Sequence, residues 1–169
     1  MRGRGLERRR APRLLSAVLR ERVRHGIAAG LIAAAATAGV LIGFGLARRQ
    51  PLRPLNAVAH MLAGSRAFYV SGFDAVVTPL ALLLHVGSVV LWGVVFAAAG
   101  ARLRGGRLWA GAALLAAGAF VVDTTLVPAR LRPGFETLLS TGELAALYVV
   151  LATSLAIGLR WSAPSRVVE

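Results

Sequence analysis

No cysteine and no lysine occur among the 169 residues of this chain. The absence of cysteine excludes disulfide bonds, cysteine-ligated zinc, iron–sulfur clusters and thiol catalysis. Charged residues are also scarce, at 16%, while 57% of the residues are hydrophobic; a typical soluble domain is about 45–50% apolar and about 25% charged. Together with a mean hydropathy of +0.69, this composition favours a membrane protein over a soluble one.

Four apolar stretches are each long enough to cross a hydrocarbon core of about 30 Å, which takes about 20 helical residues. They cover residues 26–47, 78–100, 108–127 and 141–159. Open sheet edges cannot be satisfied in lipid, and these runs do not alternate as barrel strands do. We therefore predict an all-α fold, a polytopic membrane protein with four transmembrane helices in a small bundle. The first run is longer than a signal-peptide core of about 7–15 residues, so we expect a retained helix.

The transmembrane domain is expected over residues 26–160. A basic cytoplasmic tail at 1–25 precedes it, a cytoplasmic tail at 161–169 follows it, and residues 50–74 form an outer interfacial segment. All twenty basic residues are arginine. Nine precede the first span, three lie between the second and third, and two follow the fourth, so fourteen lie on one side and six on the other. Because positive charge favours the cytoplasmic side, we predict an N-in/C-in orientation.

The formal net charge of +13 lies mainly in tails and loops that flank apolar segments. This placement fits anionic lipid headgroups and topology signals, and we expect no nucleic-acid partner. Two structures fit the tail at 1–25. Leu14, Leu15, Val18 and Leu19 share one helical face, as in an amphipathic helix on anionic lipid; the alternative is a solvated, topology-setting flank.

Helix starts are marked at two spans. Thr78-Pro79 suits a first helical turn, with Asp74 just ahead of it on the favourable side of the helix dipole. Ser140 and Glu143 have the spacing of a capping box, in which each side chain accepts a hydrogen bond from the other's backbone N–H. The fourth helix is therefore expected to begin near residue 140.

Apart from Glu143, which is better explained as a helix cap, two ionisable candidates lie within the predicted spans, His85 in the second and Asp123 near the outer end of the third. Such groups are costly in lipid and normally face protein or a cavity. His85 shares a stripe of small or polar residues with Thr78 and Ser88. Ahead of Asp123, helical steps of three and four residues run through small side chains only, namely Ala112, Ala116 and Ala119. Both residues are thus predicted on helix-packing faces.

These residues have two interpretations. In the first interpretation, His85 and Asp123 form a proton-active pair, because histidine titrates near neutral pH and a low dielectric disfavours a charged carboxylate. Alternatively, His85 bonds Ser88, Thr78 or a facing carbonyl, and Asp123 reaches interfacial water or an arginine. The second interpretation makes Asp123 part of an outer-loop clasp that ties the loop to the bundle. The predicted members of this clasp are Asp123, Arg130, Arg132 and Glu136.

The two histidines His60 and His85 also suggest a third hypothesis, in which they ligate a b-type haem between helices. Two axial ligands must face each other at one depth, so the pair meets only if the segment 50–74 dips inward. Asn56 and His60, four residues apart on one helical face, make a weak metal half-site without a third ligand. We therefore expect no metal site and no cofactor, with haem b as the alternative.

Two pieces of the chain carry a resemblance. LNAVAHMLAG (55–64), followed by His85 and Trp92, and VVDTTLVPARLRPGFETLLS (121–140), leading into ELAALYVVLA, resemble a family of short, uncharacterised bacterial inner-membrane proteins with four predicted helices. Some members are labelled as sodium:proline symporters. The resemblance covers about residues 51–159 and implies a multi-pass protein of the bacterial cytoplasmic (inner) membrane. It does not extend to Ala59-His60, where the family has Ser-His. The symporter label does not fit, because such carriers have many more helices and broken helices at the midplane.

We predict a structural or accessory protein that packs with itself, as a homo-oligomer, or with a larger membrane complex. The alternative is a proton- or ion-handling transporter subunit that uses Asp123 and His85, and the third possibility is a haem-binding protein. No phosphate-binding loop or nucleophile–base pair is recognisable, so we do not expect an enzyme.

Overall fold

The computed structural model describes the backbone of residues 4–100 and 102–162, and the side chains within these ranges from Ser16 onward. Every regular element among them is helical, as predicted. The four long elements are α1 (Arg4–Ala47), α4 (Val77–Gly100), α5 (Gly106–Val121) and α6 (Thr141–Ser162). Each is long and apolar enough to cross a membrane, α5 by continuing to Leu126, so the prediction of four such helices is confirmed.

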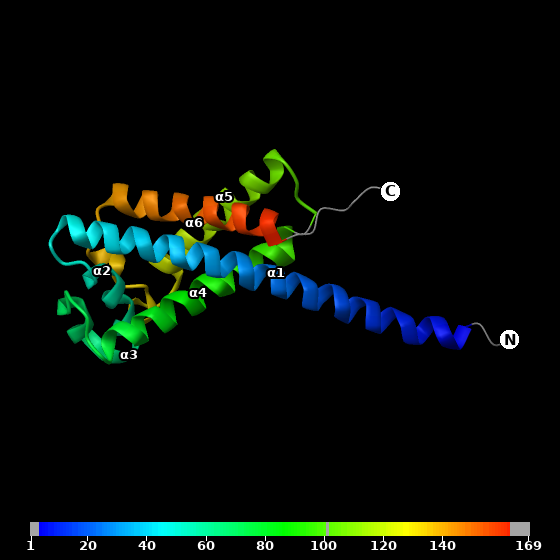
Figure 1. Ribbon diagram of the computed structural model, residues 1–169, viewed down its shortest axis with the longest axis horizontal. Helices are drawn as coiled ribbons and strands as arrows, with labels where there is room; N and C mark the ends of the chain where they lie inside the picture. Colours follow the sequence, from blue (N-terminus) through cyan, green and yellow to red (C-terminus); the bar gives the residue numbers. More distant parts are fainter. Residues whose placement is uncertain (1–3, 101, 163–169) are drawn as a thin grey trace.

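Helix α1 is one continuous helix, and the predicted boundary at residue 25 is not a break in it. Its first half extends beyond the other helices, with the N-terminus at the far end (Figure 1). At about 1.5 Å per residue, its 44 residues span about 66 Å. The tail is therefore helical from Arg4. Of the predicted apolar face, Leu14 and Leu15 lie outside the described side chains, whereas Val18 and Leu19 are exposed.

Helices α4 and α6 pack on either side of α1, and α5 packs mainly against α6 (Figure 1). Glycine makes the close approach of α1 and α4 possible. A Cβ atom added to Gly26 would lie 2.6 Å from the Cα atom of Val94, and one added to Gly30 would lie 2.6 Å from that of Val90. The motif Gly26-x-x-x-Gly30 is thus used in packing, whereas a Cβ atom added to Gly39 or Gly43 would have no neighbour within 4 Å.

Short helices close one end of the bundle, which we call the outer end after the predicted orientation; the end with the α4–α5 loop is the inner end. The first group runs through α2 (Arg53–Asn56), η1 (Ala57–Ala59), α3 (His60–Ala63) and η2 (Gly64–Tyr69). The second, between α5 and α6, has η3 (Val122–Leu126), η4 (Ala129–Leu131) and η5 (Phe135–Thr137). Leu55, Phe135 and Leu139 are buried in one cluster at this end, so the two groups form a packed cap.

The predicted helix caps are present at the outer end. Ser140 N donates to Glu143 Oε2 at 2.8 Å, and Glu143 N donates to Ser140 Oγ at 3.4 Å, which confirms the capping box. The carboxylate of Asp74 accepts from the backbone N–H groups of Val76 and Val77, so α4 begins at Val77. These two bonds, first that of Val77, and the nearby Arg66 lower the pKa of Asp74 below its ordinary value.

Candidate functional site

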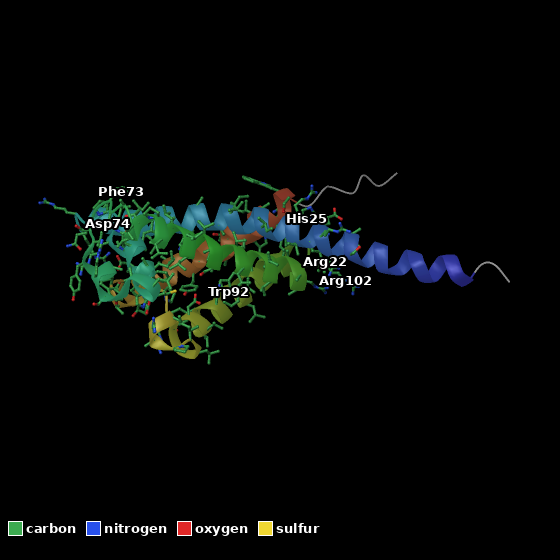
Figure 2. All side chains as sticks on the ribbon, turned by 90° about the horizontal axis from the view of Figure 1, so that it is seen from below. Arg22, His25, Phe73, Asp74, Trp92 and Arg102 are labelled. Atoms are coloured by element: carbon green, nitrogen blue, oxygen red, sulfur yellow. The ribbon has the colours of Figure 1, made fainter. Side chains whose placement is uncertain are left out.

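A cavity of about 100 Å³ lies inside the outer half of the bundle. Helices α1, α4 and α6 and both parts of the outer cap contribute to its wall, and we call it the polar cavity because His85 and Asp123 both line it. Trp92 of α4, labelled in Figure 2, is part of the same wall. The other lining residues are Thr37, Val58, Met61, Ser88, Val89, Leu131, Pro133, Phe135, Leu147, Tyr148 and Leu151.

Asp123 reaches the polar cavity from a turn of π-helix, η3, that follows α5. The hydroxyl groups of Thr124 and Thr125 donate to the backbone carbonyls of Phe120 and Val121, four residues earlier in each case. These bonds satisfy carbonyl groups that the widened turn would otherwise leave without an α-helical partner. Single π-helical turns occur frequently at functional sites, and here the turn carries the only acid that lines the polar cavity among the described residues.

Tyr148 of α6 binds Asp123 directly. Its hydroxyl donates to Asp123 Oδ2 at 2.8 Å, and its ring meets the ring of Phe120 edge to face, with centroids 5.3 Å apart. Tyr148 is 8% exposed, so this hydrogen bond forms in a largely apolar setting, where it is stronger than in water. The bond ties the end of the third span to the middle of the outer half of α6.

His85 is buried against α1 on the other wall. Its Nε2 atom lies 3.1 Å from Thr37 Oγ1 and 3.3 Å from the backbone oxygen of Ala34. The hydroxyl of Thr37 itself lies 2.8 Å from the carbonyl oxygen of Ala33, to which it donates. Since a carbonyl oxygen can only accept, Nε2 carries the hydrogen, and in the neutral ring Nδ1 is the nitrogen that can take up a proton.

The structure brings together some of the polar residues that the sequence singles out, namely His85, Asp123, Ser88 and Thr78. His85, Asp123 and Ser88 line one cavity. Thr78 does not, because its hydroxyl accepts from the backbone N–H of Asp74 at the start of α4. The facing carbonyl that we considered for His85 is that of Ala34, while Ser88 and Thr78 are not its partners in the described part of the chain.

Sequence reasoning did not identify Thr37 and Tyr148 as site residues. Thr37 has a detectable signal, since it is the single polar side chain within the alanine-rich first span. Tyr148 has a weaker signal: it lies in the outer half of the fourth span, close to the depth expected for Asp123. Connecting Thr37 with His85, or Tyr148 with Asp123, requires knowledge of which helices face each other.

The outer-loop clasp is built differently from the prediction. In the described part of the chain, Asp123 is bound by Tyr148 and by neither Arg130 nor Arg132. Arg130 is exposed, and Arg132 Nε donates to the carbonyl of Val127 at 3.3 Å, within its own loop. The physical reason is the turn at Val122–Leu126, from which the acid meets α6. The side chain of Glu136 has a buried Oε2 atom without a described hydrogen-bond partner.

His60 lies apart from the polar cavity. Its Nδ1 is 2.9 Å from the backbone oxygen of Ala57, and its ring packs against Phe68 at 4.8 Å. Asn56 is fully buried and donates instead to the carbonyls of Val70 and Gly72. The structure therefore does not bring His60 to His85 or pair it with Asn56. No group of three metal-ligating side chains was found within the described ranges.

The fold and the cavity define an all-helical bundle with four helices long and apolar enough to span a membrane. Comparisons of the chain with protein-family models, with curated proteins and with solved structures find no match.

Proposed function

We propose that this chain is a multi-pass protein of the bacterial cytoplasmic membrane, oriented N-in/C-in, in which Asp123 and His85 handle protons. The observation that carries the proposal is the polar cavity, because it is lined by both His85 and Asp123, which come from different helices. Ionisable side chains at membrane depth are rare, normally face the bundle interior or a cavity, and mark proton and ion pathways.

The hydrogen bonds around the polar cavity suggest how the proton is held. Tyr148 donates to one oxygen of Asp123, which holds the carboxyl group in a fixed position. Thr37 and Ala34 accept from Nε2 of His85, which leaves Nδ1 as its basic nitrogen. Each residue is thus positioned by a partner on another helix, and each retains an atom that can accept a proton. No enzymatic step is part of this proposal.

Proton flux into liposomes tests the proposal. The full chain is reconstituted with an internal pH-sensitive dye, and the decay of an imposed pH gradient is followed. We expect wild-type protein to accelerate the decay and Asp123→Asn, which keeps the shape but cannot titrate, to return it to the rate of empty liposomes. Glu21→Gln is the matched control, because it removes an exposed carboxylate outside the polar cavity. Unchanged flux in Asp123→Asn would rule out the carboxyl group as the proton carrier.

An accessory role is the second candidate, and one observation favours it. The N-terminal half of α1 projects as a continuous helix beyond the bundle, where it offers a partner a long surface (Figure 1). Crosslinking in cells followed by purification is expected to recover a stable partner or a homo-oligomer. Recovery of monomer alone would count against this role.

A further inference from the structure

The polar cavity contains one acid and no arginine. Asp123 is the only carboxylate that lines it in the described part of the chain, and none of its lining residues is an arginine, although the chain has twenty basic residues. His85, the other ionisable residue of the wall, donates from Nε2 to Thr37 and Ala34 of α1. With Asp123 ionised, the lining carries one negative charge, so the cavity is suited to a cation.

One carboxylate oxygen of Asp123 has no partner among the residues that the structure describes. Tyr148 donates to Oδ2 at 2.8 Å, whereas Oδ1 accepts no hydrogen bond from them. A carboxylate taken partly out of water requires donors or a positive charge in exchange. The hydroxyl of Ser88 lines the same cavity from α4 and provides a second acceptor. A positively charged group with several N–H donors would satisfy both.

The rest of the wall is mostly apolar and includes aromatic rings. Trp92 of α4 and Phe135 of η5 both line the cavity, and Phe135 is only 7% exposed. Aromatic rings attract cations through their quadrupole, most strongly for tryptophan and where water is excluded. A metal ion such as Ca²⁺ instead needs about six oxygen ligands, and the described ranges hold no group of three metal-ligating side chains. An organic cation therefore fits this wall better than a metal ion.

The volume of the polar cavity limits the size of its ligand. An apolar cavity of about 150 Å³ takes up benzene, so a cavity of about 100 Å³ has room for about four heavy atoms. Two lining residues, Ser88 of α4 and Leu131 of η4, are exposed, so the cavity reaches the surface on the side of these two elements. A short alkyl chain with one ammonium group meets the limits of size, charge and polarity.

We propose that the polar cavity binds a small primary alkylammonium ion, with its ammonium group at Asp123 and its alkyl chain against Trp92 and Phe135. The ion binds the ionised carboxylate, so its entry releases the proton that Asp123 would otherwise hold. This exchange rests on the proposed function, because one carboxyl group carries either the proton or the ion. Binding of the ion does not require proton flux, so the two are measured separately.

Titration of the full chain with n-propylammonium in an uncharged detergent at neutral pH tests the site. A ligand of this size binds no more tightly than a Kd of roughly 40 µM, a range that saturation-transfer NMR of the ligand covers. Uncharged 1-propanol has the same number of heavy atoms and should bind at least about tenfold more weakly. Asp123→Asn should raise the Kd for n-propylammonium by a similar factor, because it removes a charge-assisted hydrogen bond. Glu21→Gln, an exposed acid outside the cavity, is the matched control and should leave the Kd unchanged.

Equal Kd values for n-propylammonium and 1-propanol would overturn the proposal, because apolar contact alone would then explain the binding. An unchanged Kd in Asp123→Asn, or displacement of n-propylammonium by sodium at equal concentration, would overturn it as well. Should Asp123→Asn fail to fold, Trp92→Leu replaces it, with the Kd expected to rise about two- to fivefold and an unchanged Kd counting against the proposal. A chain that accelerates proton flux but binds no n-propylammonium would refute the ligand and leave the proposed function standing.

Discussion

Replacing Gly93 by alanine should separate α1 from α4. An added Cβ atom would lie 2.7 Å from the Cα atom of Gly30 and would also clash with the backbone oxygen of Gly26. Ordinary contact begins at 3.4 Å and the oxygen of Gly26 is nearer still than the Cα atom of Gly30, so the helices must move apart by more than 0.7 Å. Both neighbours are backbone atoms of α1, and no side chain can turn aside to make room. Overpacking of this kind costs about 1–3 kcal/mol.

Gly87 of the same helix provides the matched control, because a Cβ atom there has no neighbour within 4 Å. Both substitutions gain the same helix propensity of about 1 kcal/mol, which cancels in the comparison. Gly93→Ala should therefore be about 1–3 kcal/mol less stable than Gly87→Ala. Equilibrium unfolding by sodium dodecyl sulfate in mixed micelles measures both. Equal free energies of unfolding for the two variants would refute the close packing of α1 on α4.

Three further predictions follow from the outer end. Asp74→Ala should lower the thermal stability at neutral pH. Folding depresses the pKa of Asp74, so the stability that its carboxylate contributes is present above pH 3.8 and is lost as the pH falls through the lower pKa of the folded state. The melting temperatures of wild type and variant should therefore converge in strong acid. Gly134→Ala should destabilise the cap by about 1–2 kcal/mol, because the φ of 86° at Gly134 disfavours other residues and an added Cβ atom would lie 2.7 Å from His60 Nδ1. Gly142→Ala is the control, because a Cβ atom added there is unobstructed, and equal melting temperatures for the two variants would contradict this prediction. Protein purified from haem-replete cells should be colourless, as His60 and His85 do not share the polar cavity, and a Soret band that disappears in His85→Ala would restore the haem hypothesis.

Length and hydropathy were sufficient to predict the four long helices. The expected span 141–159 begins where the structure begins α6, because the capping box of Ser140 and Glu143 is a local signal. The predicted packing face of α5 is also confirmed: Ala112, Ala116 and Ala119 are all buried. Helical periodicity was enough to identify that face, as small side chains allow close approach in lipid.

The sequence could not predict which residues meet across helices. Asp123 was expected to bind a nearby arginine, but the π-helical turn and the position of α6 bring it to Tyr148. The extent of α1 was also missed, since the arginines within residues 4–25 were interpreted as a separate tail, whereas the helix continues through them and through Pro12. Rotation of each helix about its axis depends on contacts along its whole length, which no short motif specifies.

The central claim is that Asp123 and His85 act together through one cavity, and a double-mutant cycle on proton flux tests it most directly. Flux is measured in liposomes for wild type, for Asp123→Glu, which keeps a titratable carboxyl group and is expected to retain part of the flux, for His85→Gln and for the double variant. Residues that share a step are expected to be non-additive, so the account predicts that the double variant loses no more flux than the more severe single variant. Losses that add on a logarithmic scale would contradict a shared cavity function.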